Sequence, residues 1–208
     1  MTPTAYVVED DESIRTLWKW LMESNGIAVR TFTSAPEFID AYQRGAPGCL
    51  VLDLRLPGMS GLQLQEHLKR SRVDIPIVFV TAHGDVRTAV TAIKEGAVDF
   101  IEKPFNYQQA IAVVEKAFQR DAENRERHAG HARAASRIAL LTERERAVLQ
   151  RIIEGKQNKV IADELAISVK TVEFHRAKLM EKMGVDSVAE LVQLTLGFSL
   201  IVAPGQPG

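Results

Sequence analysis

The sequence predicts an α/β domain built on a five-stranded parallel sheet, followed by a smaller domain that contains only helices. In the first 118 residues, short apolar runs alternate with segments whose apolar residues recur at helical spacing. Uninterrupted apolar runs are typical of parallel strands that are buried on both faces. From Thr142 onward only the helical spacing remains. A chain of 208 residues, 46% of them apolar, is long enough to bury two such cores.

Five strand–helix units are predicted in the first domain. The predicted strands are Ala5–Val8, Ala28–Thr31, Leu50–Leu52, Ile77–Val80 and Phe100–Ile101. The helices that follow them are predicted at Ser13–Met22, Pro36–Tyr42, Leu62–Leu68, Val86–Ile93 and Ala110–Phe118. We therefore expect a (βα)5 architecture over residues 1–120. In open sheets of this kind, functional side chains collect beyond the carboxyl ends of the strands.

Residues 121–138 are predicted to form a helical linker to a second domain at residues 139–208. The linker is rich in alanine and charged side chains, and Gly130 is its weak point. The single cysteine, Cys49, has no partner for an internal disulfide, and no apolar run approaches the roughly 20 residues that span a bilayer. We therefore expect a cytoplasmic protein that does not enter a membrane. The Pro/Gly-rich residues 203–208 are expected to be disordered.

Charged and hydroxyl side chains follow four of the five predicted strands. They are Asp10 and Asp11 after the first strand, Asp53 after the third, Thr81 after the fourth and Lys103 after the fifth. A carboxylate attacks phosphorus when a cation neutralises the incoming dianion and donors bind its oxygens. The pattern therefore predicts a phosphoryl site with Asp53 as nucleophile and with Mg2+ bound by Asp10, Asp11 and Asp53. The Thr81 hydroxyl and the Lys103 ammonium would bind the phosphoryl oxygens.

Each of these positions also has an ordinary structural explanation. An Asp-Asp pair before a helix is a common N-cap, an aspartate at the end of a strand often caps a turn, and Lys-Pro is a common loop dipeptide. The combined occurrence at successive strand ends favours the phosphoryl site. A phosphatase that works through aspartyl-phosphate is an alternative, but the Asp-x-Asp pair expected on the first strand of such enzymes is absent.

The second domain is predicted to contain a helix-turn-helix. Thr142 and Glu145 have capping-box spacing for a first helix that ends at Gly155, and Asn158 can cap a second, short helix. A tight turn leads into a third helix at Val169–Met183, which is suited to a DNA major groove. The alternative is a helical bundle that contacts proteins. Residues 139–208 hold as many acidic as basic side chains, which counts mildly against DNA.

Four motifs of the first domain resemble the receiver domains of two-component response regulators. They are YVVEDD at residues 6–11, LVLDLRLPGMSG at 50–61, VTAHG at 80–84 and DFIEKPF at 99–105. The resemblance implies a flavodoxin-like fold in which Asp53 accepts a phosphoryl group from a sensor histidine kinase. It also implies that the backbone carbonyl of Arg55 joins the aspartates around Mg2+, and that the Lys103–Pro104 peptide bond is cis. The implied switch moves Thr81 toward the phosphoryl group and turns Phe100 inward, although a plain core position for Phe100 is equally plausible.

The second domain resembles the LuxR-type DNA-binding domain, and the whole chain resembles the FixJ branch of response regulators. The motifs are TERE at 142–145, NKVIA at 158–162, SVKTVEFH at 168–175 and KLMEKMG at 178–184. The resemblance implies base contacts from Glu173, Phe174 and Ala177, and phosphate contacts from Lys170, Thr171, His175, Arg176 and Lys178. A glutamate accepts from cytosine, and an aromatic ring contacts a thymine methyl. The implied protein is a transcription regulator and not an enzyme, with double-stranded DNA and RNA polymerase as partners. Phosphorylation would make it a homodimer, with a fourth helix at residues 187–198 as the dimer face; core packing is the alternative for that helix.

Overall fold

The computed structural model describes residues 2–82 and 86–195, which form two compact units divided between Arg125 and Glu126. The first unit alternates strands and helices, and the described part of the second contains only helices. The prediction of an α/β domain followed by an all-α domain is therefore confirmed. The predicted disorder at residues 203–208 and the last residues of the predicted fourth helix lie outside the described residues.

Five parallel strands form a single sheet in the first unit, in the order β2-β1-β3-β4-β5. The strands are β1 (Thr4–Val8), β2 (Ala28–Phe32), β3 (Gly48–Asp53), β4 (Ile77–Ala82) and β5 (Asp99–Lys103). The helices that follow them are α1 (Glu12–Ser24), α2 (Ala35–Ala41), α3 (Gly61–Arg70), α4 (Val86–Lys94) and α5 (Tyr107–Ala139). The central strand, β3, is buried along its whole length and ends at Asp53.

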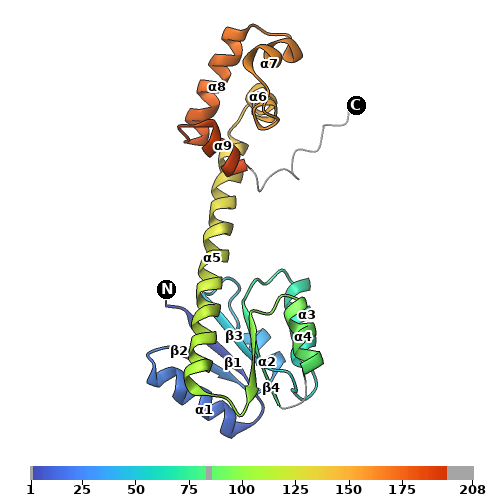
Figure 1. Ribbon diagram of the computed structural model, residues 1–208, viewed down its shortest axis with the longest axis vertical. Helices are drawn as coiled ribbons and strands as arrows, with labels where there is room; N and C mark the ends of the chain where they lie inside the picture. Colours follow the sequence, from blue (N-terminus) through green and yellow to red (C-terminus); the bar gives the residue numbers. More distant parts are fainter. Residues whose placement is uncertain (1, 83–85, 196–208) are drawn as a thin grey trace. The chain divides into compact units, whose positions relative to one another are not determined.

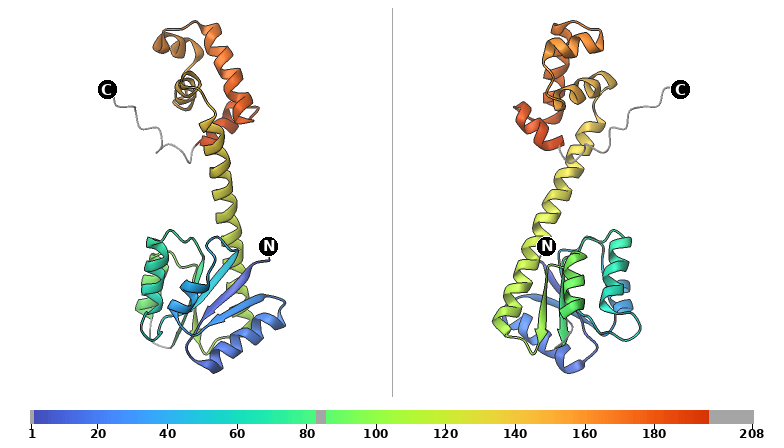
Figure 2. Two further views of the ribbon diagram at one scale, coloured as in Figure 1. Left: turned by 180° about the vertical axis from the view of Figure 1, so that it is seen from behind. Right: turned by 45° about the vertical axis from the view of Figure 1, so that its right-hand side comes forward.

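Each face of the sheet carries its own apolar core, because successive strand side chains point to opposite faces. Ala5 and Val7 of β1 pack with Trp18 of α1 and with α5. Tyr6 and Val8, on the other face, pack with α2, α3 and α4. Figures 1 and 2 show α1 and the first part of α5 on one face of the sheet, and the other three helices on the opposite face. Burial of both faces explains why the strands read as unbroken apolar runs.

Helix α5 continues well beyond the apolar segment that packs on the sheet. It is a single helix of 33 residues that includes the expected linker. Asp121 accepts a hydrogen bond from the Gly48 N–H at 3.0 Å, and Arg125 donates to the carbonyl of Gly45. Asn124 donates to Asp74 at 3.3 Å. The first five residues expected in the linker therefore pack on the first unit, which ends at Arg125 rather than near residue 120.

Helices α6 (Glu143–Ile153), α7 (Asn158–Leu165), α8 (Val169–Met183) and α9 (Val188–Thr195) follow in the second unit. The Thr142–Glu145 capping box is present. Asn158 is not a cap: it is the first residue of α7, and Gln157 occupies the cap position without a side-chain hydrogen bond. Ala166, with φ of 52°, ends α7 in the left-handed region and turns the chain toward α8. This is the predicted helix-turn-helix.

Helices α6 to α9 share one apolar core. Val148 and Ile152 of α6, Ile161 of α7 and Leu179 of α8 are all buried in it. Lys182 near the end of α8 donates to Glu145 at 2.7 Å, which ties α8 to the start of α6. Among the described residues, no helix is both long and apolar enough to cross a bilayer.

Candidate functional site

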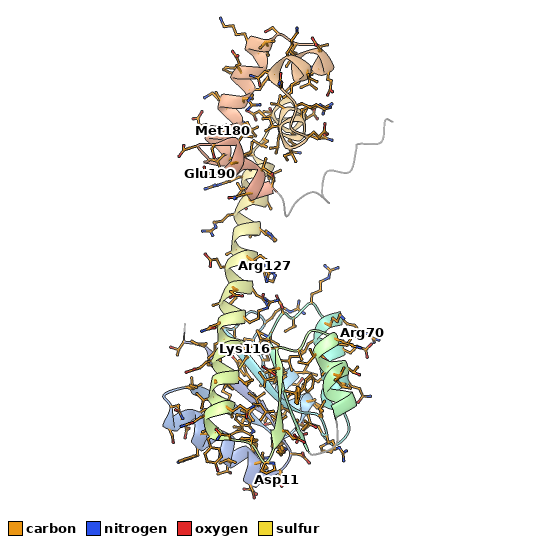
Figure 3. The ribbon with its side chains drawn as sticks, in the orientation of Figure 1. Asp11, Arg70, Lys116, Arg127, Met180 and Glu190 are labelled. Carbon is orange, nitrogen blue, oxygen red and sulfur yellow. The ribbon has the colours of Figure 1, made fainter. Side chains whose placement is uncertain are left out.

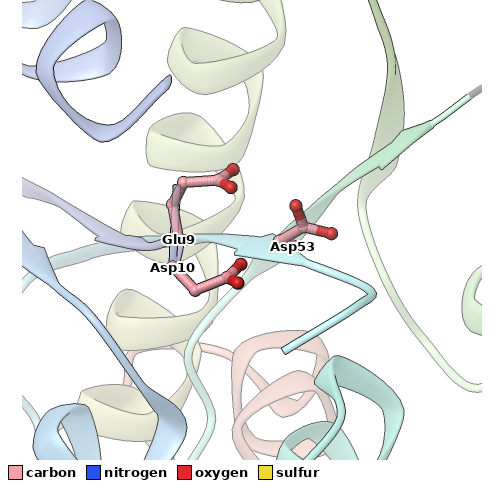
Figure 4. A group of neighbouring side chains, drawn as sticks. All are labelled: Glu9, Asp10 and Asp53. Carbon is pink, nitrogen blue, oxygen red and sulfur yellow. The ribbon is translucent and has the colours of Figure 1, made fainter. Parts of the chain in front are cut away.

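Three carboxylates from two neighbouring strands meet at the carboxyl-terminal edge of the sheet. Glu9 and Asp10 directly follow β1, and Asp53 is the last residue of β3. The strands pair in parallel with Val8 opposite Leu52, so their ends lie side by side. One oxygen of each carboxylate lies within 4.8 Å of the others. Figure 4 shows the three side chains converging on one region.

Lys103 bridges two of these carboxylates from the end of β5. Its Nζ lies 2.5 Å from Asp53 Oδ2 and 2.8 Å from Glu9 Oε2. The second oxygen of Asp53 accepts the backbone N–H of Arg55 at 2.8 Å. The peptide bond between Lys103 and Pro104 is cis, in agreement with the expectation from the resemblance. The structure thus brings together Asp10, Asp53 and Lys103 from three separate segments of the chain.

Glu9 is not among the site residues predicted from the sequence, and Asp11 has a different environment from the one expected. The side chain of Asp11 caps α1 by accepting the N–H groups of Ser13 at 2.8 Å and Ile14 at 3.0 Å. It is absent from the carboxylate group formed by Glu9, Asp10 and Asp53. Figure 3 shows Asp11 at the sheet edge where α1 begins. The N-cap alternative describes this residue: β1 ends at Val8 as predicted, but the first two acidic residues after it face Asp53 and the third caps α1.

Burial and charge perturb the groups around Asp53. Burial, followed by the neighbouring charge of Asp53, raises the pKa of Glu9 from 4.5 to about 7, although its bond to Lys103 opposes this shift. Burial acts to lower the pKa of Lys103, but its bonds to Asp53 and Glu9 outweigh burial and raise that pKa. The ammonium therefore stays charged at neutral pH and compensates the acidic cluster.

The two expected switch residues lie on neighbouring strands. Thr81 is buried near the end of β4, one residue beyond Val80, which pairs with Asp53. Phe100 lies on β5 and is 39% exposed. The alternative prediction, that Phe100 is a plain core residue, is therefore wrong in this structure. An exposed Phe100 beside the partly exposed Asp99 leaves the aromatic ring outside both apolar cores.

The donor set at the sheet edge fits a divalent cation. Magnesium takes oxygen ligands, prefers carboxylates and keeps several water molecules. Glu9, Asp10 and Asp53 supply carboxylate oxygens close enough to share one ion. Asp10 is exposed, which leaves one side of the group open to solvent.

Helix α8 carries the residues expected to contact DNA. The exposed members are Lys170, Glu173, Phe174, Ala177 and Lys178, and the partly exposed members are Thr171, His175 and Arg176. Phe174 is 60% exposed, so its ring is available for contact with a partner. Its ring makes an edge contact with His175 at 5.7 Å between centroids. The opposite side of the helix is held in the core by Val172, Leu179 and Met183.

Hydrogen bonds fix both ends of α8 within the second unit. The Ser168 hydroxyl caps the first turn by accepting the Thr171 N–H at 3.1 Å. At the other end, Arg137 donates to the carbonyl of Met183 at 2.6 Å, and Gly184 adopts the left-handed conformation. Cations are favourable beside the carbonyl end of a helix. The exposed face of α8 is therefore presented on a firmly held helix.

Two family models match the chain. The model described as "Response regulator receiver domain" matches residues 5–115, and the model described as "Bacterial regulatory proteins, luxR family" matches residues 139–195. Together they match most of both units, and most of the long helix α5 lies outside the two matches.

Curated proteins are similar over nearly the whole chain. The transcriptional regulatory protein FixJ of Azorhizobium caulinodans is 43% identical over 191 residues, which are 92% of this chain and 90% of that protein. The response regulator protein TodT of Pseudomonas putida is 39% identical over 190 residues, which are 91% of this chain and 84% of that protein.

Solved structures are similar as well. The response regulator StyR matches with a TM-score of 0.80 and 43% identity, over 95% of this chain and all of that one. Full-length FixJ from B. japonicum matches with a TM-score of 0.58 and 38% identity, over 94% of this chain and 97% of that one.

Proposed function

The chain belongs to the response regulators that join a receiver domain to a LuxR-family DNA-binding domain, and from this premise we propose how its residues perform that function. It is a two-component response regulator that controls transcription, with a histidine kinase and DNA as the partners that its two domains imply. We propose that Asp53 is the phosphoacceptor. The observation that carries this proposal is the joint contact of Asp53 with Lys103 and the Arg55 N–H beside two further carboxylates.

The proposed reaction moves a phosphoryl group onto Asp53. A carboxylate oxygen of Asp53 forms a bond to phosphorus while the bond between phosphorus and the donor histidine nitrogen breaks. Lys103 already lies against Asp53 Oδ2 and would hold a phosphoryl oxygen on the product. Thr81 would donate its hydroxyl to another phosphoryl oxygen, and Phe100 would exchange its exposed position for an inward one. Hydrolysis of the resulting acyl phosphate would reset the protein without making it a turnover enzyme.

We propose that Glu9, Asp10 and Asp53 hold Mg2+, together with the backbone carbonyl of Arg55. A bound Mg2+ would neutralise the negative charge that builds up as the phosphoryl group approaches the carboxylates. Asp11 would stay at the start of α1 as its cap. Its contribution would be to fix the loop that carries Glu9 and Asp10.

The output step is proposed to depend on two copies of the chain. Phosphorylation would shift a two-state equilibrium of the receiver domain toward a form that dimerises. Glu173, Phe174 and Ala177 would then face base edges, and Lys170, Thr171, His175, Arg176 and Lys178 would face phosphates. The dimer face would include α9, and the DNA-bound dimer would act on RNA polymerase. Two linked modules gain effective concentration on a paired site, which compensates for the neutral charge of each.

Selection of genomic DNA fragments by the full-length chain tests this proposal. The chain is incubated with Mg2+, with and without beryllofluoride, which mimics a phosphoryl group on Asp53. We expect a few fragments to be enriched only with beryllofluoride. Asp53→Asn should abolish this stimulation, because the mimic needs the carboxylate.

A double variant with Lys170→Ala and Lys178→Ala tests DNA binding by α8 and leaves the receiver domain unaltered. It should show no enrichment in either condition, because it lacks two of the proposed phosphate contacts of α8. Enrichment that is equal with and without beryllofluoride, or stimulation that survives Asp53→Asn, would contradict the proposed switch.

A further inference from the structure

Three consecutive main-chain carbonyl groups at the start of α1 accept hydrogen bonds from one residue, Arg15. Its guanidinium nitrogen Nη1 lies 3.0 Å from the Glu9 carbonyl oxygen and 3.1 Å from that of Asp10. Its backbone nitrogen lies 2.9 Å from the Asp11 carbonyl oxygen, as expected in the first turn of a helix. The first two bonds come from a side chain, and they select the two residues whose carboxylates face Asp53.

The loop between β1 and α1 consists of few residues, and the contacts of Arg15 hold the two that carry the carboxylates. Pairing with β2 and β3 fixes β1 as far as Val8, and the N-cap of Asp11 fixes the start of α1. Glu9 and Asp10 are the residues between these two anchors. The carbonyl carbon and the Cβ of a residue are attached to the same Cα. A carbonyl that is held in place therefore also limits where the carboxylate points. Arg15 holds both carbonyls from the side of α1.

We propose that Arg15 is a positioning residue of the cation site, which holds the main chain of Glu9 and Asp10 so that their carboxylates converge with Asp53. The inference rests on the proposed function, because it concerns the proposed Mg2+ site. Arg15 acts through the main chain of the two acidic residues. It is half-buried, so its guanidinium is partly withdrawn from water and its hydrogen bonds are correspondingly specific.

The positive charge of Arg15 would weaken cation binding, whereas its positioning role would strengthen it. The direction of the change in Mg2+ affinity when Arg15 is replaced therefore tells the two effects apart. The pKa of Asp11 is held below its ordinary value first by the hydrogen bonds from Ile14 and Ser13, and least by the charges of Lys103 and Arg15. A guanidinium whose field reaches this loop also repels a divalent cation. If repulsion dominates, removal of Arg15 tightens Mg2+ binding. If positioning dominates, removal weakens it.

Titration calorimetry with magnesium chloride on the full-length chain distinguishes these effects. We expect Arg15→Met to weaken Mg2+ binding about tenfold or more, the range typical of groups that orient metal ligands. Arg15→Lys keeps the charge but loses the planar fork, and should weaken binding less. The matched control is Lys19→Met, which removes one positive charge from an exposed position on the same helix. It should stay within about twofold of the unaltered chain, because exposed charges are screened.

Urea unfolding of the same variants shows whether Arg15 is only structural. A merely structural role lowers stability but leaves the Mg2+ affinity of the folded protein unchanged. Binding by folded Arg15→Met that is as tight as in the unaltered chain, or tighter, would overturn the inference. If Arg15→Met does not fold, Arg15→Lys decides, since an unaltered affinity overturns the inference and a reduced one supports it. Failure of the unaltered chain to bind Mg2+ would instead overturn the proposed cation site itself.

Discussion

At the scale of single residues, Glu9 is a buried acid whose ionisation lowers the stability of the folded chain. Its side chain is 2% exposed and lies beside Asp53, and its pKa is raised from 4.5 to about 7. The folded chain therefore binds more protons than the unfolded chain between these two pKa values. By linkage, the contribution of Glu9 to stability is lost as the pH rises from about 4.5 to about 7.

Replacement of Glu9 by glutamine should remove this pH dependence. Glutamine resembles the protonated acid, so Glu9→Gln should stabilise the metal-free chain at pH 8 by an amount on the order of 1–3 kcal/mol. The difference from the unaltered chain should shrink toward pH 5. Urea unfolding in a chelating buffer at several pH values measures both. Glu115→Gln, at an exposed position on α5, is the matched control and should show neither effect. A stability difference that does not change with pH would contradict the argument.

The same residue shows how far the sequence predicts the site. The strand-end pattern identified Asp10, Asp53 and Lys103, which the structure brings to one edge of the sheet. It did not identify Glu9: β1 ends at Val8 as predicted, but three acidic residues follow it, and apolar spacing does not show which of them face the site. Asp11, which has the same chemistry as Asp10, is taken up by the cap of α1.

At the scale of secondary-structure elements, β3 is held at both of its ends. Its last residue, Asp53, bonds Lys103, and the N–H of its first residue, Gly48, bonds Asp121 on α5. Gly48 has no room for a side chain, since a Cβ there would lie 2.0 Å from the Thr4 carbonyl oxygen. This close packing leaves the buried N–H of Gly48 dependent on Asp121 for a hydrogen-bond acceptor.

Removal of Asp121 should therefore destabilise the first unit. Asp121→Ala leaves a buried N–H without its acceptor, which costs about 1–3 kcal/mol. Burial raises the pKa of Asp121, so loss of its costly charge offsets part of this and places the net loss at the lower end. Urea unfolding of the full-length chain at neutral pH measures the loss. Glu123→Ala, at an exposed position on the same helix, is the control. Equal stability of the two variants would show that Asp121 does not support β3.

The strands and helices of the first unit were predicted from the sequence, but the packing of residues 121–125 of α5 against that unit was not. Apolar spacing predicts an element from neighbouring residues, and it predicted all five strands and the helix-turn-helix. Residues 121–125 carry too few large apolar side chains to give such a signal. Their contacts are polar and join segments far apart in the chain, since Gly48 and Asp121 are 73 positions apart. A contact of this kind is visible only once the sheet is folded.

At the scale of the whole molecule, the neutral net charge of the DNA-binding domain limits the affinity of one copy for DNA. Residues 139–208 hold equal numbers of acidic and basic side chains, so under the proposed function attraction to phosphates would come from the basic side chains on α8. Much of the affinity of DNA-binding proteins comes from released counterions, and the number released increases with the number of phosphates contacted. One copy of this domain should therefore bind weakly, and two linked copies should bind far more tightly.

A pair of DNA duplexes tests this dependence. Once fragment selection has identified a target, one duplex carries both half-sites and the other has one half-site scrambled. With beryllofluoride, we expect the paired duplex to bind about a hundredfold more tightly or more, because the second contact becomes intramolecular. The slope of log affinity against log salt should also be close to twice as steep, since twice as many phosphates are engaged. Asp53→Asn should bind both duplexes like the unphosphorylated chain. If the two duplexes bind equally well and with equal salt slopes, a single copy supplies the affinity, and phosphorylation must act on some step other than pairing.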